Sequence, residues 1–147
     1  EIPQAIYDTC PDAHLTLVMR RLMMRIANAI AREREALALV TGESVGQVAS
    51  QTIEALVTTD DVADMPVFRP LIGMDKVEIM DYAARIGTYE TSILPYEDCC
   101  TVFVPRHPTT RPKLEDIRRS EALLPYGEMV SRAVAERTVE EITFEYR

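Results

Sequence analysis

Residues 37–46, LALVTGESVG, decide the fold class of this chain. The short apolar run at residues 37–40 ends just before Gly42, which is typical of a buried strand in a parallel sheet. A helix is expected over residues 45–56, directly after the turn. Residues 66–71 predict a second short strand, because the prolines there suit its two ends rather than its centre. This order indicates an α/β fold with a parallel sheet flanked by helices.

Two strands are too few for a doubly wound sheet, which usually has about five or six. The sequence therefore predicts a sheet that is incomplete on its N-terminal side. Asp75 is a plausible N-cap for a helix that runs to Ile86, and Gly87 is placed as its C-cap glycine. Other helices are expected at residues 3–10, 15–35, 113–124 and 127–137, with residues 138–146 as a strand or a trailing tail.

The composition limits the classes of function. The 147 residues suit one domain, and 16 basic against 24 acidic residues give a formal charge of −8. This balance argues against a dedicated nucleic-acid-binding domain, although an enzyme that touches RNA locally remains compatible with it. No apolar run approaches the ~20 residues of a membrane-spanning helix. Three cysteines without a secretion signal favour a reducing, cytoplasmic setting.

The turn at residues 41–46 is the first candidate site. A helix that opens after a strand presents free N–H groups, which suit a phosphate. The same turn matches the Gly-x-Ser-x-Gly nucleophile elbow, with Ser44 as nucleophile and His107 downstream, so an α/β serine hydrolase is an alternative. An ordinary strand-to-helix turn with a serine cap is the third interpretation.

A long proline-rich loop at residues 93–112 carries Cys99 and Cys100. A thiolate there would be a nucleophile or a sulfur carrier, since reactivity follows thiolate character and exposure. We expect Cys10 to be buried packing. Lys76, beyond the carboxyl end of the second strand, could neutralise a phosphate. No cysteine pair has zinc-site spacing, so no metal site is predicted.

Three arginines interrupt the apolar pattern of the long helix at residues 15–35. Arg21 and Arg25 are one turn apart on one face, whereas Arg20 points elsewhere. The expectation for this group is a solvated face whose aliphatic stems lie on apolar surface.

Several motifs occur together and in one order. They are MRRLMMR at residues 19–25, LVTGESVGQVASQT at 39–52, RPLIGMDK at 69–76, IGTY at 86–89 and PYEDCCT at 95–101. This series resembles the tRNA 4-thiouridine synthases, which are ATP-dependent tRNA sulfurtransferases also called thiamine biosynthesis protein I. The likeness covers roughly residues 1–120, with the motifs in family order, and is highly specific.

The resemblance implies an adenine-nucleotide alpha-hydrolase-like fold, the PP-loop ATP pyrophosphatase. Residues 1–147 correspond to the later part of that domain. The Ser-Gly-Gly-x-Asp-Ser phosphate loop, the THUMP domain and the ferredoxin-like domain of the family are absent from this chain. The chain by itself is therefore expected to be inactive, and a non-catalytic nucleotide-binding fragment is a further alternative.

The family's activity is implied for the parent protein. It adenylates uridine 8 of tRNA and replaces its oxygen with persulfide sulfur, giving 4-thiouridine, and it supplies sulfur for the thiamine thiazole. The implied partners are ATP with Mg²⁺, tRNA and a persulfide donor of the cysteine desulfurase type, and a homodimer is in keeping with the family. By position, the ATP-binding candidates are Arg20, Gly42, Glu43, Ser44 and Gln51, and the catalytic candidates are Lys76 and Cys99.

Overall fold

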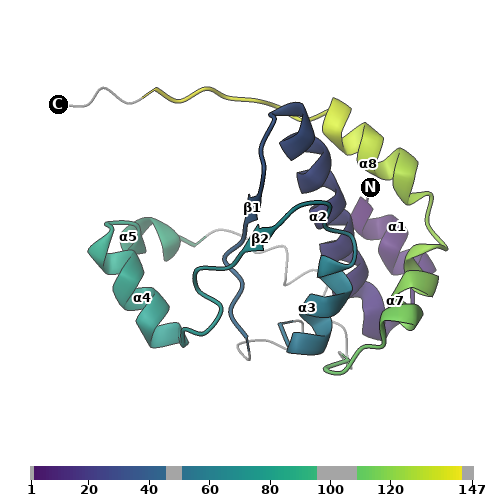
Figure 1. Ribbon diagram of the computed structural model, residues 1–147, viewed down its shortest axis with the longest axis horizontal. Coiled ribbons are helices and arrows are strands. Elements are labelled where there is room, and N and C mark those ends of the chain that lie inside the picture. The colour runs from purple at the N-terminus through teal and green to yellow at the C-terminus, as the bar shows by residue number, and fades with distance from the viewer. Residues whose placement is uncertain (1, 46–50, 96–108, 144–147) are drawn as a thin grey trace.

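The computed structural model describes residues 2–45, 51–95 and 109–143 (Figure 1). Helices α1 (Ile2–Thr9) and α2 (Leu15–Glu33) lead into strand β1 (Leu39–Val40), and α3 (Ile53–Asp60) leads into strand β2 (Val67–Phe68). The remaining helices are α4 (Lys76–Arg85), α5 (Tyr89–Ser92), α7 (Leu114–Glu121) and α8 (Tyr126–Ala135). None of these helices is both long and apolar enough to cross a membrane.

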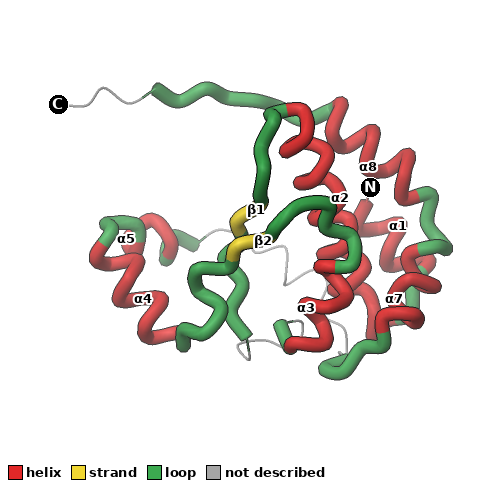
Figure 2. Tube along the Cα trace, in the orientation of Figure 1, coloured by secondary structure: helices red, strands yellow, loops and turns green. Residues whose placement is uncertain are grey.

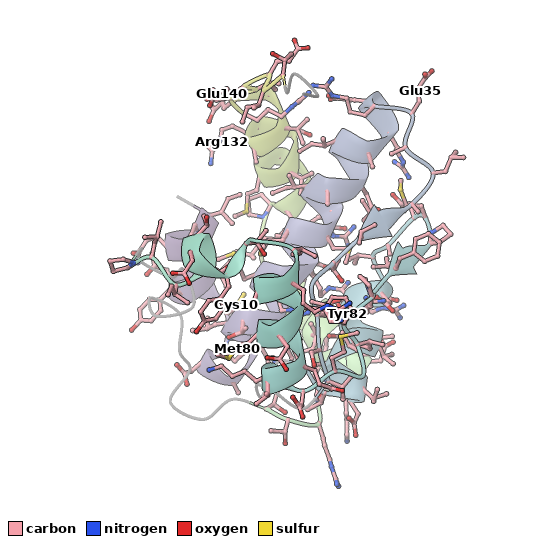
Figure 3. The ribbon with its side chains drawn as sticks, turned by 90° about the vertical axis from the view of Figure 1, so that its left-hand side faces the viewer. Cys10, Glu35, Met80, Tyr82, Arg132 and Glu140 are labelled. Atoms are coloured by element: carbon pink, nitrogen blue, oxygen red, sulfur yellow. The ribbon has the colours of Figure 1, made fainter. Side chains whose placement is uncertain are left out.

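Helix α2 is the centre of the larger lobe, and α1, α3, α7 and α8 all contact it (Figure 1). Its apolar stripe packs with Ile6 of α1, Ala55 of α3 and Ile117 of α7 to form the core. The predicted long amphipathic helix is confirmed. It ends because Glu35 takes a left-handed conformation with φ 54° and Ala36 N–H donates to Ala31 O at 2.9 Å, closing a Schellman motif. Glu35 stands at that end of the helix in Figure 3.

The two strands pair in parallel, with Leu39 opposite Val67 and Val40 opposite Phe68. The predicted parallel α/β arrangement is therefore confirmed. The expectation that the first strand is buried is wrong, since Val40 is 69% exposed. Among the residues that the structure describes, the sheet has these two strands alone, and one residue of each strand is exposed. Val40 is exposed because the sheet is incomplete, as the sequence predicted.

The helix expected over residues 45–56 is wrong at its start. Helix α3 begins at Ile53, because the Thr52 side chain accepts a hydrogen bond from Ala55 N at 3.1 Å and caps it. Residues 46–50 lie outside the described part. Residues 138–143 extend away from α8 without regular structure (Figure 2), which favours the trailing tail over the strand.

Helices α4 and α5 lie on the far side of the strands from α2 (Figure 1). The predicted Asp75 cap is confirmed as a capping box, in which Glu78 N donates to Asp75 Oδ1 at 2.9 Å and Asp75 N donates to Glu78 Oε2 at 2.8 Å. Gly87 takes φ 73°, which confirms its place as the C-cap glycine. No residue of α4 is buried, and Met80 and Tyr82 stand exposed on it (Figure 3).

Candidate functional site

Two loops follow the carboxyl ends of β1 and β2. Because the strands are parallel, both loops lie at the same edge of the sheet, where open α/β sheets bind ligands. Two hydrogen bonds join the loops: Val45 N–H donates to Ile72 O at 3.1 Å, and Ser44 Oγ donates to Met74 O at 2.6 Å. Lys76 follows this second contact by two residues and is exposed at the start of α4. The turn after β1 and the segment that leads to Lys76, both predicted as candidate sites, therefore meet at one edge of the sheet.

Glu43, in the loop after β1, binds three side chains and is buried, with 9% exposure. Its Oε1 forms an ion pair with Arg20 Nη2 of α2. Its Oε2 accepts hydrogen bonds from Arg69 Nε at 2.6 Å and from Thr41 Oγ1 at 2.9 Å. The carboxylate thus organises two guanidinium groups that arrive from different elements.

Ser44 is 2% exposed. Its N–H donates to Gln51 Oε1 at 3.1 Å, which brings the Gln51 amide against the turn. A nucleophile elbow presents an exposed hydroxyl, whereas the hydroxyl of Ser44 is buried and donates to the Met74 carbonyl. The geometry therefore disfavours the serine hydrolase alternative, and His107 lies outside the described residues.

Gly42 is exposed, and a Cβ added there would meet no atom of the described residues within 4 Å. The space above this part of the turn is therefore open to a ligand. The structure brings Arg20, Glu43, Ser44 and Gln51 together around it, with Lys76 at the start of α4 beyond the neighbouring loop. Cys99 and Cys100 lie outside the described residues, so their predicted roles stay predictions.

The sequence analysis did not identify two residues of this cluster, Arg69 and Asp60. Arg69 donates to Glu43, and its Nη2 forms an ion pair with Asp60, the last residue of α3. Arg69 belongs to the segment at residues 69–76 that carried the family resemblance, and it directly follows a strand. The predicted strand at residues 66–71 included Arg69, so its place after the strand became clear only from the structure, and nothing in the sequence pointed to Asp60.

The expectation of a solvated face for Arg21 and Arg25 is wrong. Arg21 is 1% exposed, and its Nε and Nη2 donate to Glu121 Oε2 at 3.1 and 2.7 Å. Its Nη1 donates to Thr58 O at 2.6 Å and to Asp61 Oδ2 at 2.9 Å. Arg25 Nε donates to Glu121 Oε1 at 2.9 Å. The reason is tertiary, because α3 and α7 bring their carboxylates onto this side of α2.

The Arg25 guanidinium also lies 4.5 Å from the centroid of the Tyr126 ring of α8, a cation–π contact. Beside this contact is a small cavity between α2 and α8, of about 210 Å³, lined by Arg25, Asn28, Arg32 and Tyr126 among others. None of the residues predicted as functional lines this cavity.

Cys10 is buried in the core, with its Sγ 3.5 Å from Ser120 O. Burial raises the pKa of the Cys10 thiol, and the charge of Glu121 raises it further. The packing prediction for Cys10 is confirmed. Within residues 2–45, 51–95 and 109–143, no group of three or more potential metal-ligating side chains gathers.

Glu121 and Asp61, the two carboxylates that bind the buried Arg21, stay ionised to a lower pH than free carboxylates do. Burial alone would raise the pKa of Glu121, but hydrogen bonds from Arg25 and Arg21 outweigh it and lower that pKa. The hydrogen bond from Arg118 lowers the pKa of Asp61, against a smaller opposing effect of burial, and Arg21 adds to the lowering.

This lowering predicts acid lability. A carboxylate with a depressed folded-state pKa contributes stability that is complete above its unfolded pKa, about 4. The contribution is lost as the pH falls through the lower, folded-state pKa. We expect the free energy of unfolding in urea to fall between about pH 5 and pH 3, and to fall less steeply in the Glu121→Gln variant. Parallel pH profiles for the two proteins would contradict this assignment.

The paired parallel strands, their flanking helices and the residue cluster at the carboxyl ends define an incomplete α/β fold of the PP-loop ATP pyrophosphatase class. The family model described as "Thiamine biosynthesis protein (ThiI)" matches residues 1–125, and the chain belongs to this family.

The similar proteins agree with this assignment. A probable tRNA sulfurtransferase of Acetivibrio thermocellus is 62% identical over 143 residues, which are 97% of this chain and 36% of that protein. A probable tRNA sulfurtransferase of Clostridium botulinum is 57% identical over 92% of this chain and 35% of its own length. A crystal structure of a 4-thiouridine synthetase in complex with RNA and with bound ATP has a TM-score of 0.88 at 42% identity, covering 95% of this chain and 36% of that chain. The chain thus spans about a third of the length of these relatives.

Proposed function

We propose that residues 1–147 are the later part of the PP-loop ATP pyrophosphatase domain of a longer tRNA sulfurtransferase. In that protein the phosphate loop and the ferredoxin-like and THUMP domains would belong to the rest of the chain. The protein adenylates uridine 8 of tRNA, converts it to 4-thiouridine and supplies sulfur for the thiamine thiazole. The observation that carries this proposal is the cluster of Arg20, Glu43, Ser44 and Gln51 at the carboxyl ends of the strands, together with membership of the family.

ATP fits this cluster on the chemistry of the residues present. The open space above Gly42 lets a ligand approach the backbone, and Arg20 provides a cation for a phosphate. The Gln51 amide is already held against the turn by Ser44 N–H. The 42% identical 4-thiouridine synthetase has bound ATP, which supports the same ligand here. Lys76, exposed at the start of α4, would offset charge that develops on the transferring phosphoryl group.

Mg²⁺ would arrive with the ATP phosphates rather than in a protein cage. Glu43, the buried carboxylate of the cluster, already accepts from Arg20 and Arg69. Because both of its oxygens are already paired, Glu43 is better suited to position the two guanidinium groups than to bind a metal ion.

Sulfur transfer is assigned to Cys99. A persulfide on Cys99, loaded by a cysteine desulfurase-type donor, delivers its terminal sulfur to C4 of the uracil. The new C–S bond replaces the C–O bond to AMP, which leaves with the oxygen. A second thiol then breaks the remaining S–S bond and forms a disulfide with Cys99. Cys100 is either that resolving partner or packing. A cytoplasmic location and a homodimer complete the proposal.

The test uses the full-length protein with tRNA and ATP. Arg20→Ala and Gln51→Ala should each raise the KM for ATP, with Arg20→Ala raising it about 10–100-fold, because a hydrogen bond to a charged group is lost. Arg32→Ala is the matched control, since the Arg32 side chain of the same helix is 66% exposed and pairs with Asp64.

The outcome separates the candidate functions. ATP-dependent 4-thiouridine formation that Arg20→Ala weakens and Arg32→Ala does not supports the proposal. ATP binding without tRNA thiolation would leave a nucleotide-binding protein only. Labelling of Ser44 by a fluorophosphonate would restore the hydrolase alternative.

A further inference from the structure

Arg69 is held at both ends of its guanidinium group. Nε donates to Glu43 Oε2 at 2.6 Å, Nη2 pairs with Asp60 at the end of α3, and the side chain is 12% exposed. A largely buried guanidinium with two carboxylate partners has little freedom to move, because another position would leave the buried Glu43 carboxylate without this partner. Arg69 therefore defines where the Glu43 carboxylate lies.

Glu43 in turn meets Arg20 through its other oxygen, Oε1. Arg69 arrives from the end of β2 and Arg20 from α2, so one carboxylate is shared between two cations from different elements. If Arg69 were absent, Oε2 of Glu43 would keep only the hydrogen bond from Thr41 Oγ1, and its remaining lone-pair site would be available to Arg20. A two-oxygen pairing of guanidinium with carboxylate is stronger than a one-oxygen pairing, so Arg20 would then be held more tightly away from an incoming phosphate.

The anchor of this arrangement is the end of α3. Asp60 binds Arg69. The adjacent Asp61 binds the buried Arg21 and also the exposed Arg118. Arg21 is the neighbour of Arg20 on α2. The adjacent residues Arg20 and Arg21 on α2, and Asp60 and Asp61 at the end of α3, therefore link the loop cluster to the ion pairs of the buried Arg21.

We propose that Arg69 is a positioning residue of the nucleotide site, which acts on ATP through Glu43 and Arg20 and does not touch the nucleotide. This inference rests on the proposed function, because it assigns a role toward ATP. It adds Arg69, with Asp60 as its anchor, to the residues that determine ATP affinity.

The experiment is a double-mutant cycle in the full-length protein, with ATP as the ligand and tRNA as the acceptor. Arg69→Met keeps an unbranched stem of similar length but removes the charge. It should raise the KM for ATP about tenfold, within the range of coupling between residues in contact, and leave kcat within about threefold. In the Arg20→Ala background the same Arg69→Met change should leave the KM for ATP unaltered.

Two further variants keep the result interpretable if Arg69→Met folds poorly. Arg69→Lys restores a cation beside Glu43 and should recover part of the ATP affinity. Asp60→Asn removes the charge of the anchor and should raise the KM for ATP, again only when Arg20 is present. Arg32→Met is the matched control and should leave the KM for ATP unchanged.

The contrary results are distinct. An equal rise in KM with and without Arg20 would overturn the inference, because Arg69 would then act independently of Arg20. An unchanged KM in Arg69→Met would overturn it as well. Failure of the unaltered protein to bind ATP would contradict the proposed function itself, and the inference would fall with it.

Discussion

Replacing Cys99 with serine in the full-length protein is expected to abolish sulfur transfer to tRNA and to leave ATP binding within about twofold of normal. The family resemblance assigns the persulfide to this residue. A serine hydroxyl cannot carry a persulfide, and a nucleophile contributes to the chemical step rather than to ground-state binding. The measurement is 4-thiouridine content after single turnover, together with the Kd for ATP.

The other two cysteines are the controls for this result. Cys100→Ser tests the neighbouring thiol, and activity lost there but kept in Cys99→Ser would move the role to Cys100. Cys10 is buried in the core beside Ser120, so Cys10→Ser should cost stability alone. Activity in both the Cys99 and Cys100 single variants would refute the sulfur-carrier assignment.

Replacing Glu121 with alanine is expected to lower the free energy of unfolding by about 3–5 kcal/mol, because breaking a buried ion pair leaves uncompensated buried charge. The Glu121 side chain is 3% exposed, and both Arg21 and Arg25 donate to it. Arg21 itself is fully buried, so water cannot replace the lost partner. The measurement is urea unfolding at pH 7, followed by circular dichroism.

Glu115 provides the matched control on the same helix. Its side chain is 72% exposed and pairs with Arg118 one turn away, so Glu115→Ala should change stability little. Equal losses in the two variants would show that α7 tolerates no substitution of a carboxylate, and the assignment to the buried pair would fail.

Several elements were predictable because their causes are local. The capping box that starts α4 needs Asp75 and Glu78 alone, three residues apart. Gly87 ends that helix because glycine adopts a positive φ without strain. The apolar spacing of α2 and the pairing of two strands around a helix also follow from short stretches of sequence. The order of the family motifs identified the class without any contact being known.

The candidate site was predictable only in part. Gly42, Glu43, Ser44 and Gln51 are near one another in sequence, and Arg20 entered through the resemblance. The ion pair of Arg69 with Asp60 was missed, because it forms only when the end of β2 reaches the end of α3. The predicted helix start at residue 45 failed for a local reason, because the Thr52 side chain caps the helix at Ile53.

The sequence by itself determined most helical segments and both strands, because periodicity and caps act over a few residues, and the order of the motifs along the chain identified the family. The tertiary structure alone decided which charged side chains are buried. Arg21 looked like a surface residue, yet its partner Glu121 lies 100 positions along the chain. A carboxylate that distant is brought to Arg21 by the packing of α7 on α2, and burial of a charge is stable only where such a partner arrives.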